Sequence, residues 1–419
     1  MMNSLRMFLK RDGWMLFIFI GLLAFPFIVA TLTGSSPTGV PRGDRMIMRG
    51  ESVRWQAVLI EVFILSLLAM SYNLLFGFTG VVSFGHALFF GLSGYIFGIL
   101  LEYTALDTGL ATGLGIVLGI AASGLLGLGI GLATLRLKGV YFAIFTLALA
   151  EMGFIFFSRL QLTKAEDGFA IGELPGWLDP TQSRLTFYYI TLAVFVLGFL
   201  LLRRLMASPT GAVFKAIREN EDRAQSIGFN TLRFKLLSLV IAGMMAGAAG
   251  ILQVMLNKKV GPELLGLSYT IDPLLMTIIG GTGTLLGPVI GAAGLHLLDV
   301  GLRDQVLALG GASIRIADVW GLILGAIFIL VVMVFPYGVV GTYQRWRVKR
   351  RHRGEAPGPA PSRAARRQAL IRINGGGPPN RIWTRRRGRH SLRETRQDRG
   401  SPWTTRPAPS SKPPPSAVS

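Results

Sequence analysis

Long stretches of apolar residues recur along the first 342 positions, and they restrict what this chain can fold into more than any other feature. A helix needs about 20 residues to cross the hydrocarbon core of a bilayer. Stretches of that order alternate here with polar segments, so the sequence predicts an all-α, polytopic integral membrane protein. The clearest stretches are 14–31, 58–75, 84–103, 110–135, 140–157, 185–202, 236–255 and 319–340.

Composition supports a membrane protein and excludes several kinds of site. Residues of the hydrophobic set make up 51% of the chain and charged residues only 16%. The chain has no cysteine, which excludes disulfides, thiolate nucleophiles and iron–sulfur clusters. The four histidines, at 86, 296, 352 and 390, are too far apart in sequence to form a local metal motif. We therefore expect no metal and no cofactor in this chain.

The net charge of +21 is concentrated at the C-terminal end. Residues 344–419 contribute +17, whereas residues 1–343 contribute only +4. This division predicts a transmembrane domain at 1–343 and a basic cytoplasmic tail at 344–419, disordered because it lacks apolar periodicity. The tail either binds anionic lipid head groups weakly or has no selected function. The charge therefore does not indicate a nucleic-acid partner.

The stretch 272–302 has two interpretations. Its centre contains Gly280, Gly281 and Gly283, which interrupt a helix, so it is either one kinked helix or two short arms of a hairpin within the membrane. The excess of Lys and Arg in 203–235 places that loop in the cytoplasm, and the basic tail belongs there too. An even number of crossings must join them. This favours two arms, about ten membrane-embedded helices and two cytoplasmic termini.

The first apolar stretch also has two interpretations. Basic residues precede it, as they do in a secretory signal peptide. Its apolar core is longer than the roughly 7 to 15 residues of a signal peptide, and no clear cleavage site follows. We therefore favour a retained membrane helix.

A second glycine-rich segment, 76–91, combines helix-breaking residues with polar ones. Gly80 and Gly85 predict an interruption in the membrane, and the hydrogen-bonding side chains near it are candidates for a translocation path. Close helix packing with local hydrogen bonds explains the same pattern equally well. The polar candidates are Asn73, Thr79, Ser83 and His86, with Thr282 from the other glycine-rich segment.

Three carboxylates lie in or near apolar stretches, where an ionised group is costly without a partner, water or a proton. They are Glu61, Glu151 and Asp272. Glu151 lies deepest in its stretch, so we add it to the translocation-path candidates. Glu61 and Asp272 fit positions near helix ends facing water equally well.

The polar segment 208–228 predicts a short amphipathic helix or helix pair. Ser208 and Pro209 suit the start of a helix, and Gly228 suits its end. Apolar residues recur at three- to four- and seven-residue spacing, at Phe214, Ile217, Ala224 and Ile227. The chain has no nucleotide-binding motif, so this segment is a plausible docking element for a separate motor subunit. A helix lying on the lipid surface is the alternative, but the polar face mixes both signs of charge.

Four segments resemble one family. Residues 71–91, 135–148, 215–228 and 278–291 are similar, in order and spacing, to segments of permease subunits from ATP-binding-cassette importers of the branched-chain amino acid group, of the LivM type. The resemblance covers roughly residues 55–343. It implies a non-catalytic multi-pass permease in the bacterial inner membrane. The implied partners are a second, LivH-like permease, two ATP-binding subunits and an extracytoplasmic solute-binding protein.

The resemblance also implies roles for residues. The segment 208–228 corresponds to the loop that couples the permease to its ATPase. The residues expected to make that contact are Phe214, Lys215, Ala216, Ile217, Arg218, Glu219, Asn220, Glu221, Asp222 and Gly228.

Several functions stay open at this stage. Branched-chain amino acids are the leading solutes, but related permeases move urea, short amides and aromatic acids. An ion-coupled secondary transporter using Glu61 or Glu151 is the second hypothesis. An intramembrane enzyme ranks third, because the sequence contains none of the common catalytic motifs.

Overall fold

The protein is described here by a computed structural model. It describes residues 2–346 except 39, 43–44, 48–49, 138, 303–305, 310–311, 316–318, 336–337 and 344. The chain divides into two units, Met1–Gly354 and Glu355–Ser419. Everything below concerns the first unit. The predicted tail, from residue 347 onward, lies outside the described residues.

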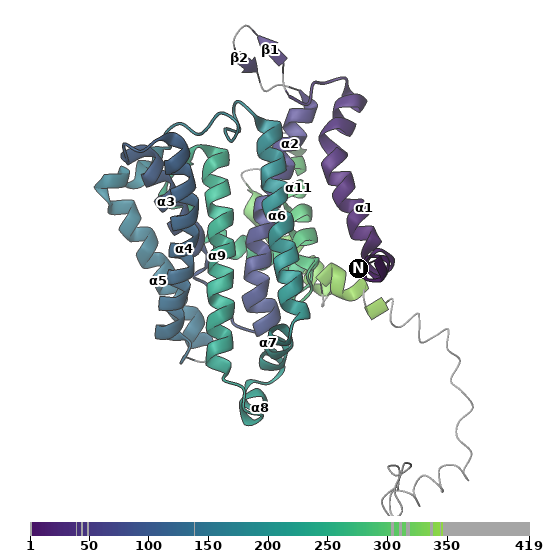
Figure 1. Ribbon diagram of the computed structural model, residues 1–419, viewed down its shortest axis with the longest axis vertical. Coiled ribbons are helices and arrows are strands. Elements are labelled where there is room, and N and C mark those ends of the chain that lie inside the picture. The colour runs from purple at the N-terminus through teal and green to yellow at the C-terminus, as the bar shows by residue number, and fades with distance from the viewer. Residues whose placement is uncertain are drawn as a thin grey trace, which may run out of the picture. The chain divides into compact units, whose positions relative to one another are not determined.

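The described part is a bundle of α-helices, which confirms the all-α prediction (Figure 1). Each apolar stretch is largely helical. The segment 208–228, predicted as one amphipathic helix or a pair, forms two short helices at one end of the bundle. We call this the α7 end. The membrane-type helices are α1 (Met2–Thr33), α2 (Glu51–Asn73), α3 (His86–Tyr103), α4 (Thr108–Thr134), α5 (Val140–Arg159), α6 (Arg184–Ala207), α9 (Thr231–Asn257), α10 (Ser268–Gly280), α11 (Gly287–Leu302) and α12 (Trp320–Val334).

Strands and short 3₁₀ helices occur only in the connections of the described part. The strands form three antiparallel pairs, and the pair β1–β2 lies at the end opposite α7 (Figure 1). The pairs are β1 (Val40–Arg42) with β2 (Arg45–Ile47), β3 (Phe169–Ala170) with β4 (Lys259–Val260), and β5 (Val306–Leu309) with β6 (Ala312–Arg315). The 3₁₀ turns are η2 (Gln161–Thr163), η3 (Ala165–Asp167) and η4 (Pro262–Leu265).

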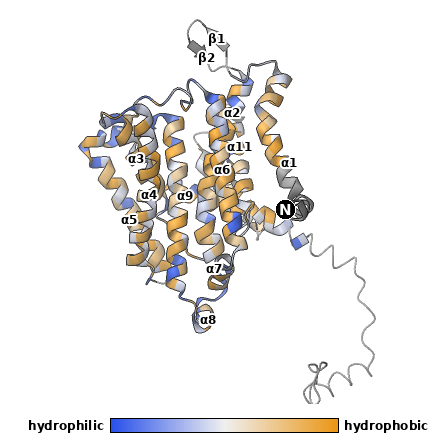
Figure 2. Ribbon diagram, in the orientation of Figure 1, coloured by the Kyte–Doolittle hydropathy of each residue, from blue (hydrophilic) through white to orange (hydrophobic). Residues whose placement is uncertain are grey.

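Six of the described helices are long and apolar enough to cross a membrane. They are α2 with its extension to Thr79, α3, α4, α5, α6 and α9. Figure 2 shows hydrophobic residues along these helices and hydrophilic ones gathered mainly at their ends and around α7. This distribution is that of a multi-pass membrane protein.

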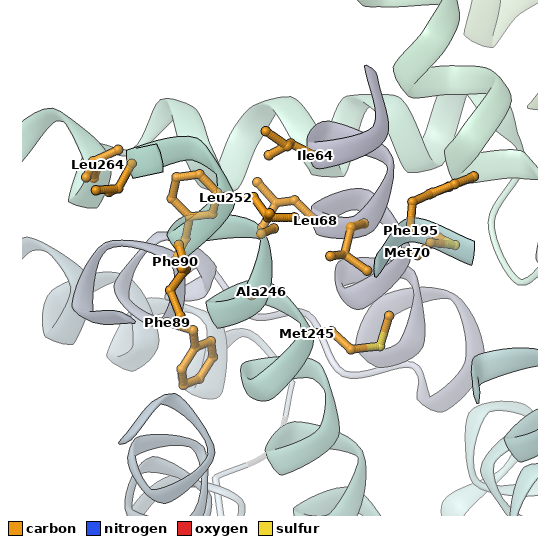
Figure 3. Packing of buried hydrophobic residues seen from close by; sticks show 14 of the residues in the cluster. Ile64, Leu68, Met70, Phe89, Phe90, Phe195, Met245, Ala246, Leu252 and Leu264 are labelled. Carbon is orange, nitrogen blue, oxygen red and sulfur yellow. The ribbon is translucent and has the colours of Figure 1, made fainter. Parts of the chain in front are cut away.

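The core lies where α2, α3, α6 and α9 pack together (Figure 3). Ile64 and Leu68 of α2 lie in one cluster with Phe89 and Phe90 of α3 and with residues of α9. Burial differs greatly between helices. In the most apolar window, 83% of residues are buried for α2 with its extension, against 22% for α5. One face of α5 is therefore available to lipid or to another subunit.

The stretch 272–302 forms two separate arms, α10 and α11, joined by residues 281–286. The arms approach closely because glycines face the opposing backbone. A Cβ atom at Gly291 would lie 1.8 Å from the carbonyl oxygen of Met276, and one at Gly280 would lie 1.7 Å from that of Gly287. The two backbones can therefore approach this closely only because these positions have no side chain. The two-arm interpretation is thus the one that the structure adopts.

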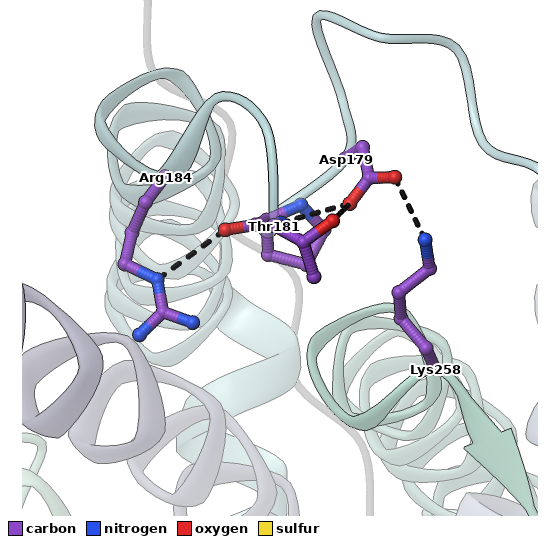
Figure 4. A network of polar contacts seen from close by, with 5 residues as sticks. Asp179, Thr181, Arg184 and Lys258 are labelled. Atoms are coloured by element: carbon purple, nitrogen blue, oxygen red, sulfur yellow. Dashed lines mark hydrogen bonds and ion pairs between the residues drawn. The ribbon is translucent and has the colours of Figure 1, made fainter. Parts of the chain in front are cut away.

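The connection between α5 and α6 is fastened to the end of α9 by an ion pair (Figure 4). Lys258 Nζ lies 2.7 Å from Asp179 Oδ2, and Asp179 Oδ1 accepts hydrogen bonds from the backbone N–H and hydroxyl of Thr181. Burial of the carboxylate raises the pKa of Asp179. The hydrogen bonds from Lys258 and Thr181 and the charge of Lys258 outweigh it and hold this pKa below its usual value.

Helix α1 packs against α2 and α6. The Tyr188 hydroxyl donates to the carbonyl oxygen of Leu22 at 2.7 Å, and the Ser52 hydroxyl donates to that of Pro26 at 2.9 Å. These bonds join α1 to the start of α6 and of α2. Phe19 and Leu22 of α1 also pack against the apolar core.

Candidate coupling and translocation site

The segment 208–228 folds as two short helices, α7 (Pro209–Glu219) and α8 (Glu221–Ser226). Ser208 is the N-cap residue and Pro209 the first helical residue, as predicted, but the Ser208 hydroxyl donates to Leu205 rather than capping α7. Asn220 separates the helices, and its side-chain oxygen accepts the N–H of Arg223 at 2.9 Å, which caps α8. After α8, Gly228 turns the chain with φ +96°.

The apolar face of this helix pair packs on the membrane helices. Phe214, Ile217 and Ala224 are buried, and the Phe214 ring contacts that of Phe234 on α9 with centroids 6.3 Å apart. The prediction for Ile227 is wrong, because 68% of this residue is exposed. Helix α8 ends at Ser226, so Ile227 lies in the turn and no longer follows the helical period.

The opposite face is polar and exposed. Among the acidic residues of α7 and α8, Glu221 alone is partly buried, because its carboxylate lies 2.6 Å from Lys235 Nζ on α9. Ala216 is half-buried. The exposed members of the predicted coupling set are Lys215, Arg218, Glu219, Asn220, Asp222 and Gly228.

Helix α2 does not end regularly at its α7 end. It continues as a π-helix, η1 (Leu74–Thr79), and stops at Gly80, which has φ +73°. A π-helical turn widens the backbone, and its hydrogen bonds skip one residue further than in an α-helix. The N–H of Val81 reaches back to the carbonyl oxygen of Leu75 at 3.0 Å, which closes this last turn.

The hairpin connection 281–286 lies against this irregular end of α2. Asn73 makes the link with both ends of its amide. Its nitrogen donates to the carbonyl oxygen of Thr284 at 2.8 Å, and its oxygen accepts the N–H of Gly283 at 2.9 Å. Asn73 is only 1% exposed. A buried amide satisfied in this way fixes the hairpin relative to α2.

Arg218 reaches the same place from α7. Its guanidinium donates to the carbonyl oxygen of Gly77 in η1, and a second nitrogen lies 3.4 Å from the hydroxyl oxygen of Thr282 in the hairpin connection. The family resemblance implies that Arg218 contacts the ATPase, whereas these bonds point toward the membrane helices. Sequence periodicity could not reveal this, because a long side chain extends beyond the face on which its Cα lies.

The glycine-rich segment 80–85 is not helical, and its backbone runs from the α7 end back into the bundle. His86, which begins α3, lies beside Ser71, eight residues before the end of η1 at Thr79. Backbone groups at that depth need partners. Thr146 of α5 accepts the N–H of Phe84 at 3.1 Å, and Thr270 of α10 accepts that of Ala87 at 2.9 Å.

His86 itself is fully buried. One ring nitrogen lies 2.8 Å from the Ser71 hydroxyl, while the other, Nδ1, has no hydrogen-bond partner. The ring packs edge-on against Tyr72 and Phe89. In this arrangement His86 holds the start of α3 against α2.

The other path candidates lie in different surroundings. The Thr79 hydroxyl donates to Leu75 in its own helix at 2.6 Å, and the Ser83 hydroxyl accepts the N–H of Gly85 at 3.3 Å. Thr282 is half-buried beside Arg218. Glu151 is separate from all of these, because it lies on the exposed face of α5. The structure therefore gathers Asn73 and Thr282 at the hairpin connection and leaves Glu151 on the surface.

A second cluster of polar residues lines a cavity of about 310 Å³ between α2, α10, α11 and α12. The sequence patterns indicated only some of these residues. Glu61 and Asp272 both lie there, and His296 of α11 places its Nε2 3.4 Å from a carboxylate oxygen of Glu61. His296 was not singled out, because a lone histidine in an apolar stretch gives no signal of its partners. In the described part, no group of three or more His, Asp or Glu side chains is arranged to hold a metal ion.

The family described as the branched-chain amino acid transport system permease component matches residues 55–332. The chain belongs to this family. The match begins in α2 and ends in α12, so it contains η1, both short helices at the α7 end and the α10–α11 hairpin. The resemblance found in the sequence is confirmed.

Individual permeases agree with the family. The chain is 28% identical over 289 residues to the high-affinity branched-chain amino acid transport system permease protein LivM of Escherichia coli, covering 62% of this chain and 66% of that protein. It is 25% identical over 311 residues to a probable LivM of Methanocaldococcus jannaschii, covering 65% and 89%. It is also 25% identical over 289 residues to the permease protein LivH of Escherichia coli, covering 66% and 91%.

The coverage of the enterobacterial LivM proteins is partial. The chain spans 64% of the length of the LivM of Salmonella typhimurium and 66% of that of Escherichia coli. The family match, at residues 55–332, includes neither α1 nor the basic tail.

Proposed function

We propose that this chain is the non-catalytic membrane subunit of an ATP-binding-cassette importer that moves branched-chain or related amino acids across the bacterial inner membrane. The observation that carries the proposal is the α7–α8 pair. One face packs on the membrane helices and the other presents exposed charged residues at one end of the bundle. In a chain of a transport permease family, such a pair suits the docking of an ATP-hydrolysing subunit.

The partners follow from what this chain contains and lacks. Two ATP-binding subunits would supply the hydrolysis, and a soluble solute-binding protein would deliver the amino acid at the opposite end of the bundle. Closure of the ATP-binding subunits would push on α7 and α8 and switch the permease between outward-facing and inward-facing states. The chain itself binds and guides the solute and makes no covalent step.

A second, LivH-like permease would complete the membrane domain. Glu151 supports this, because a carboxylate on the exposed face of a membrane helix is costly against lipid. A second permease against α5 would cover that face and provide water or a polar partner. The translocation path would then lie between the two permeases, with the α2–α3 break and the hairpin connection at its α7 end.

The test reverses one charge on the exposed face. Glu219→Arg places a positive charge where the ATP-binding subunit docks, and like charges brought together at an interface cost on the order of several kcal/mol. We expect the variant to reach the membrane at normal abundance and to lose its ATP-binding subunit on purification. Uptake of leucine, isoleucine or valine into vesicles should fall with it.

The matched control is Glu102→Arg, which reverses an exposed acidic residue at the end of α3 opposite α7. It should retain the ATP-binding subunit. Uptake is measured with ATP present and the ion gradients collapsed. A Glu219→Arg variant that keeps its ATP-binding subunit and transports at the parental rate would contradict the proposal, as would uptake by the parent that needs only an ion gradient.

A further inference from the structure

We propose that Arg218 is a positioning residue that transmits movement of α7 to the α2 break and the hairpin connection, by capping the C-terminal end of α2. The inference rests on the proposed function. It assigns to Arg218 a role that is distinct from contact with the ATP-binding subunit. Three elements meet at this one side chain, α7, η1 and the connection 281–286.

The end of a helix attracts a positive charge. The last carbonyl groups of a helix have no partners within it, and the helix dipole places partial negative charge there. In η1 the guanidinium of Arg218 supplies a donor to the carbonyl oxygen of Gly77. An unwound segment follows immediately, so no further turn of α2 can supply that donor. Arg218 therefore replaces a helical hydrogen bond with one that comes from another element.

Glycines make room for this side chain. A Cβ atom at Gly283 would lie 2.2 Å from Arg218 Nη1, and one at Gly80 would lie 3.3 Å from its Cγ. Both glycines have positive φ, of +74° and +73°. Gly283 thus leaves open the space that the guanidinium occupies, and Gly80 lets the first part of the Arg218 side chain pass close to the backbone. The planar fork can then donate to η1 and Thr282 at once. A lysine has only a single ammonium group at its tip and cannot reproduce that geometry.

The contact extends beyond Arg218 itself. Gly283, beside the guanidinium, donates its N–H to Asn73, and Asn73 in turn donates to Thr284. The hairpin connection is therefore held between α2 and α7 by polar contacts of Asn73 and Arg218. A displacement of α7 that pulls Arg218 must move the Gly77 carbonyl or the hairpin connection, or break a charge-assisted hydrogen bond.

The rest of α7 is attached differently. Val213, Phe214 and Ile217 hold it to the bundle by apolar packing. That packing does not depend on Arg218, so a substitution there should leave α7 in place and its outer face intact. Loss of transmission can then be separated from loss of docking.

The experiment compares Arg218→Ala with the parent in the reconstituted importer, by hydrogen exchange with and without ATP. In the parent, ATP should change exchange in both α7 and residues 281–286. In Arg218→Ala the change in α7 should persist and the change in 281–286 should be lost, with leucine uptake reduced about tenfold because a charge-assisted bond is of the strong kind. Arg218→Lys should keep part of the ATP response in 281–286 and part of the leucine uptake, since its ammonium group can still donate to the carbonyl oxygen of Gly77.

The control is Arg233→Ala, which removes an exposed arginine from the first turn of α9. It should behave as the parent. If Arg218→Ala does not accumulate, Thr282→Val removes only the hydroxyl acceptor and should weaken the response of 281–286, whereas Thr282→Ser should keep it. An undiminished response of 281–286 in Arg218→Ala or Thr282→Val would overturn the inference. A parent without any ATP response in α7 would instead contradict the proposed function.

Discussion

The close approach of α10 and α11 makes a sharp prediction at Gly291. A Cβ atom there would lie 1.8 Å from the carbonyl oxygen of Met276 and 3.1 Å from its Cα. A Cβ essentially never lies within 3.0 Å of a heavy atom from a residue to which it is not bonded and which is not its neighbour in the chain. Because the obstacle is backbone, no rotation of a side chain relieves it. Gly291→Ala must therefore push the two arms apart by more than about 1 Å, which overpacks the hairpin.

The same helix offers a matched control in Gly294, which has no atom within 4 Å of its Cβ position. Both substitutions gain the same helix propensity, about 1 kcal/mol for Gly to Ala in a helix, so this gain cancels between them. What remains is the overpacking cost, about 1–3 kcal/mol. We expect Gly291→Ala to be less stable than Gly294→Ala by that amount.

The assay is thermal inactivation of the purified importer in detergent, followed by ATP-driven uptake after reconstitution. Gly291→Ala should inactivate several degrees below Gly294→Ala and transport more slowly, because the connection 281–286 moves with the arms. Equal inactivation temperatures for the two variants would refute the reasoning, since it would mean that the arms are not in contact at Gly291.

Two further predictions follow from single contacts. Gly281 has φ +125°, so Gly281→Ala should already impair uptake, and Gly281→Leu should impair it more; parental uptake in both would show the turn to be adaptable. The lowered pKa of Asp179 means that its ion pair stabilises the fold above about pH 4 and is lost as pH falls further. Asp179→Asn should therefore lower the inactivation temperature at neutral pH and remove the part of the acid destabilisation that comes from this ion pair. Parallel pH profiles of the inactivation temperature for the parent and the variant would show that the ion pair does not stabilise the fold.

The positions of the membrane helices were predictable because hydrophobic length is a local property of the chain. The glycine-rich interruptions at Gly80 and Gly281 were predictable for the same reason, since the residue type alone permits the backbone to turn. The amphipathic segment 208–228, predicted as one helix or a pair, followed from the spacing of apolar residues such as Phe214 and Ile217. Each of these conclusions needed only a few neighbouring residues.

The contacts between elements were not predictable in this way. Thr146 accepts the N–H of Phe84 in the unwound segment, and Thr270 accepts that of Ala87 at the start of α3, across 62 and 183 residues of sequence. Nothing in their own helices distinguishes these threonines from packing threonines. The direction of Arg218 depends on the space left by Gly283, 65 positions further along the chain. Such pairings are set by tertiary packing, so a single sequence gives no signal for them.

The sparse burial of α5 has a consequence for how stable the protein is in the cell before it assembles. A copy synthesised without the partner subunits proposed above would present Glu151 and a broad apolar face to lipid, and polar groups in that setting are unfavourable. Association with other subunits would remove the penalty, and mass action then makes stability depend on their supply. Unassembled copies should accordingly be recognised by membrane quality-control proteases. Abundance of this subunit would in that way be matched to abundance of the others without any transcriptional control.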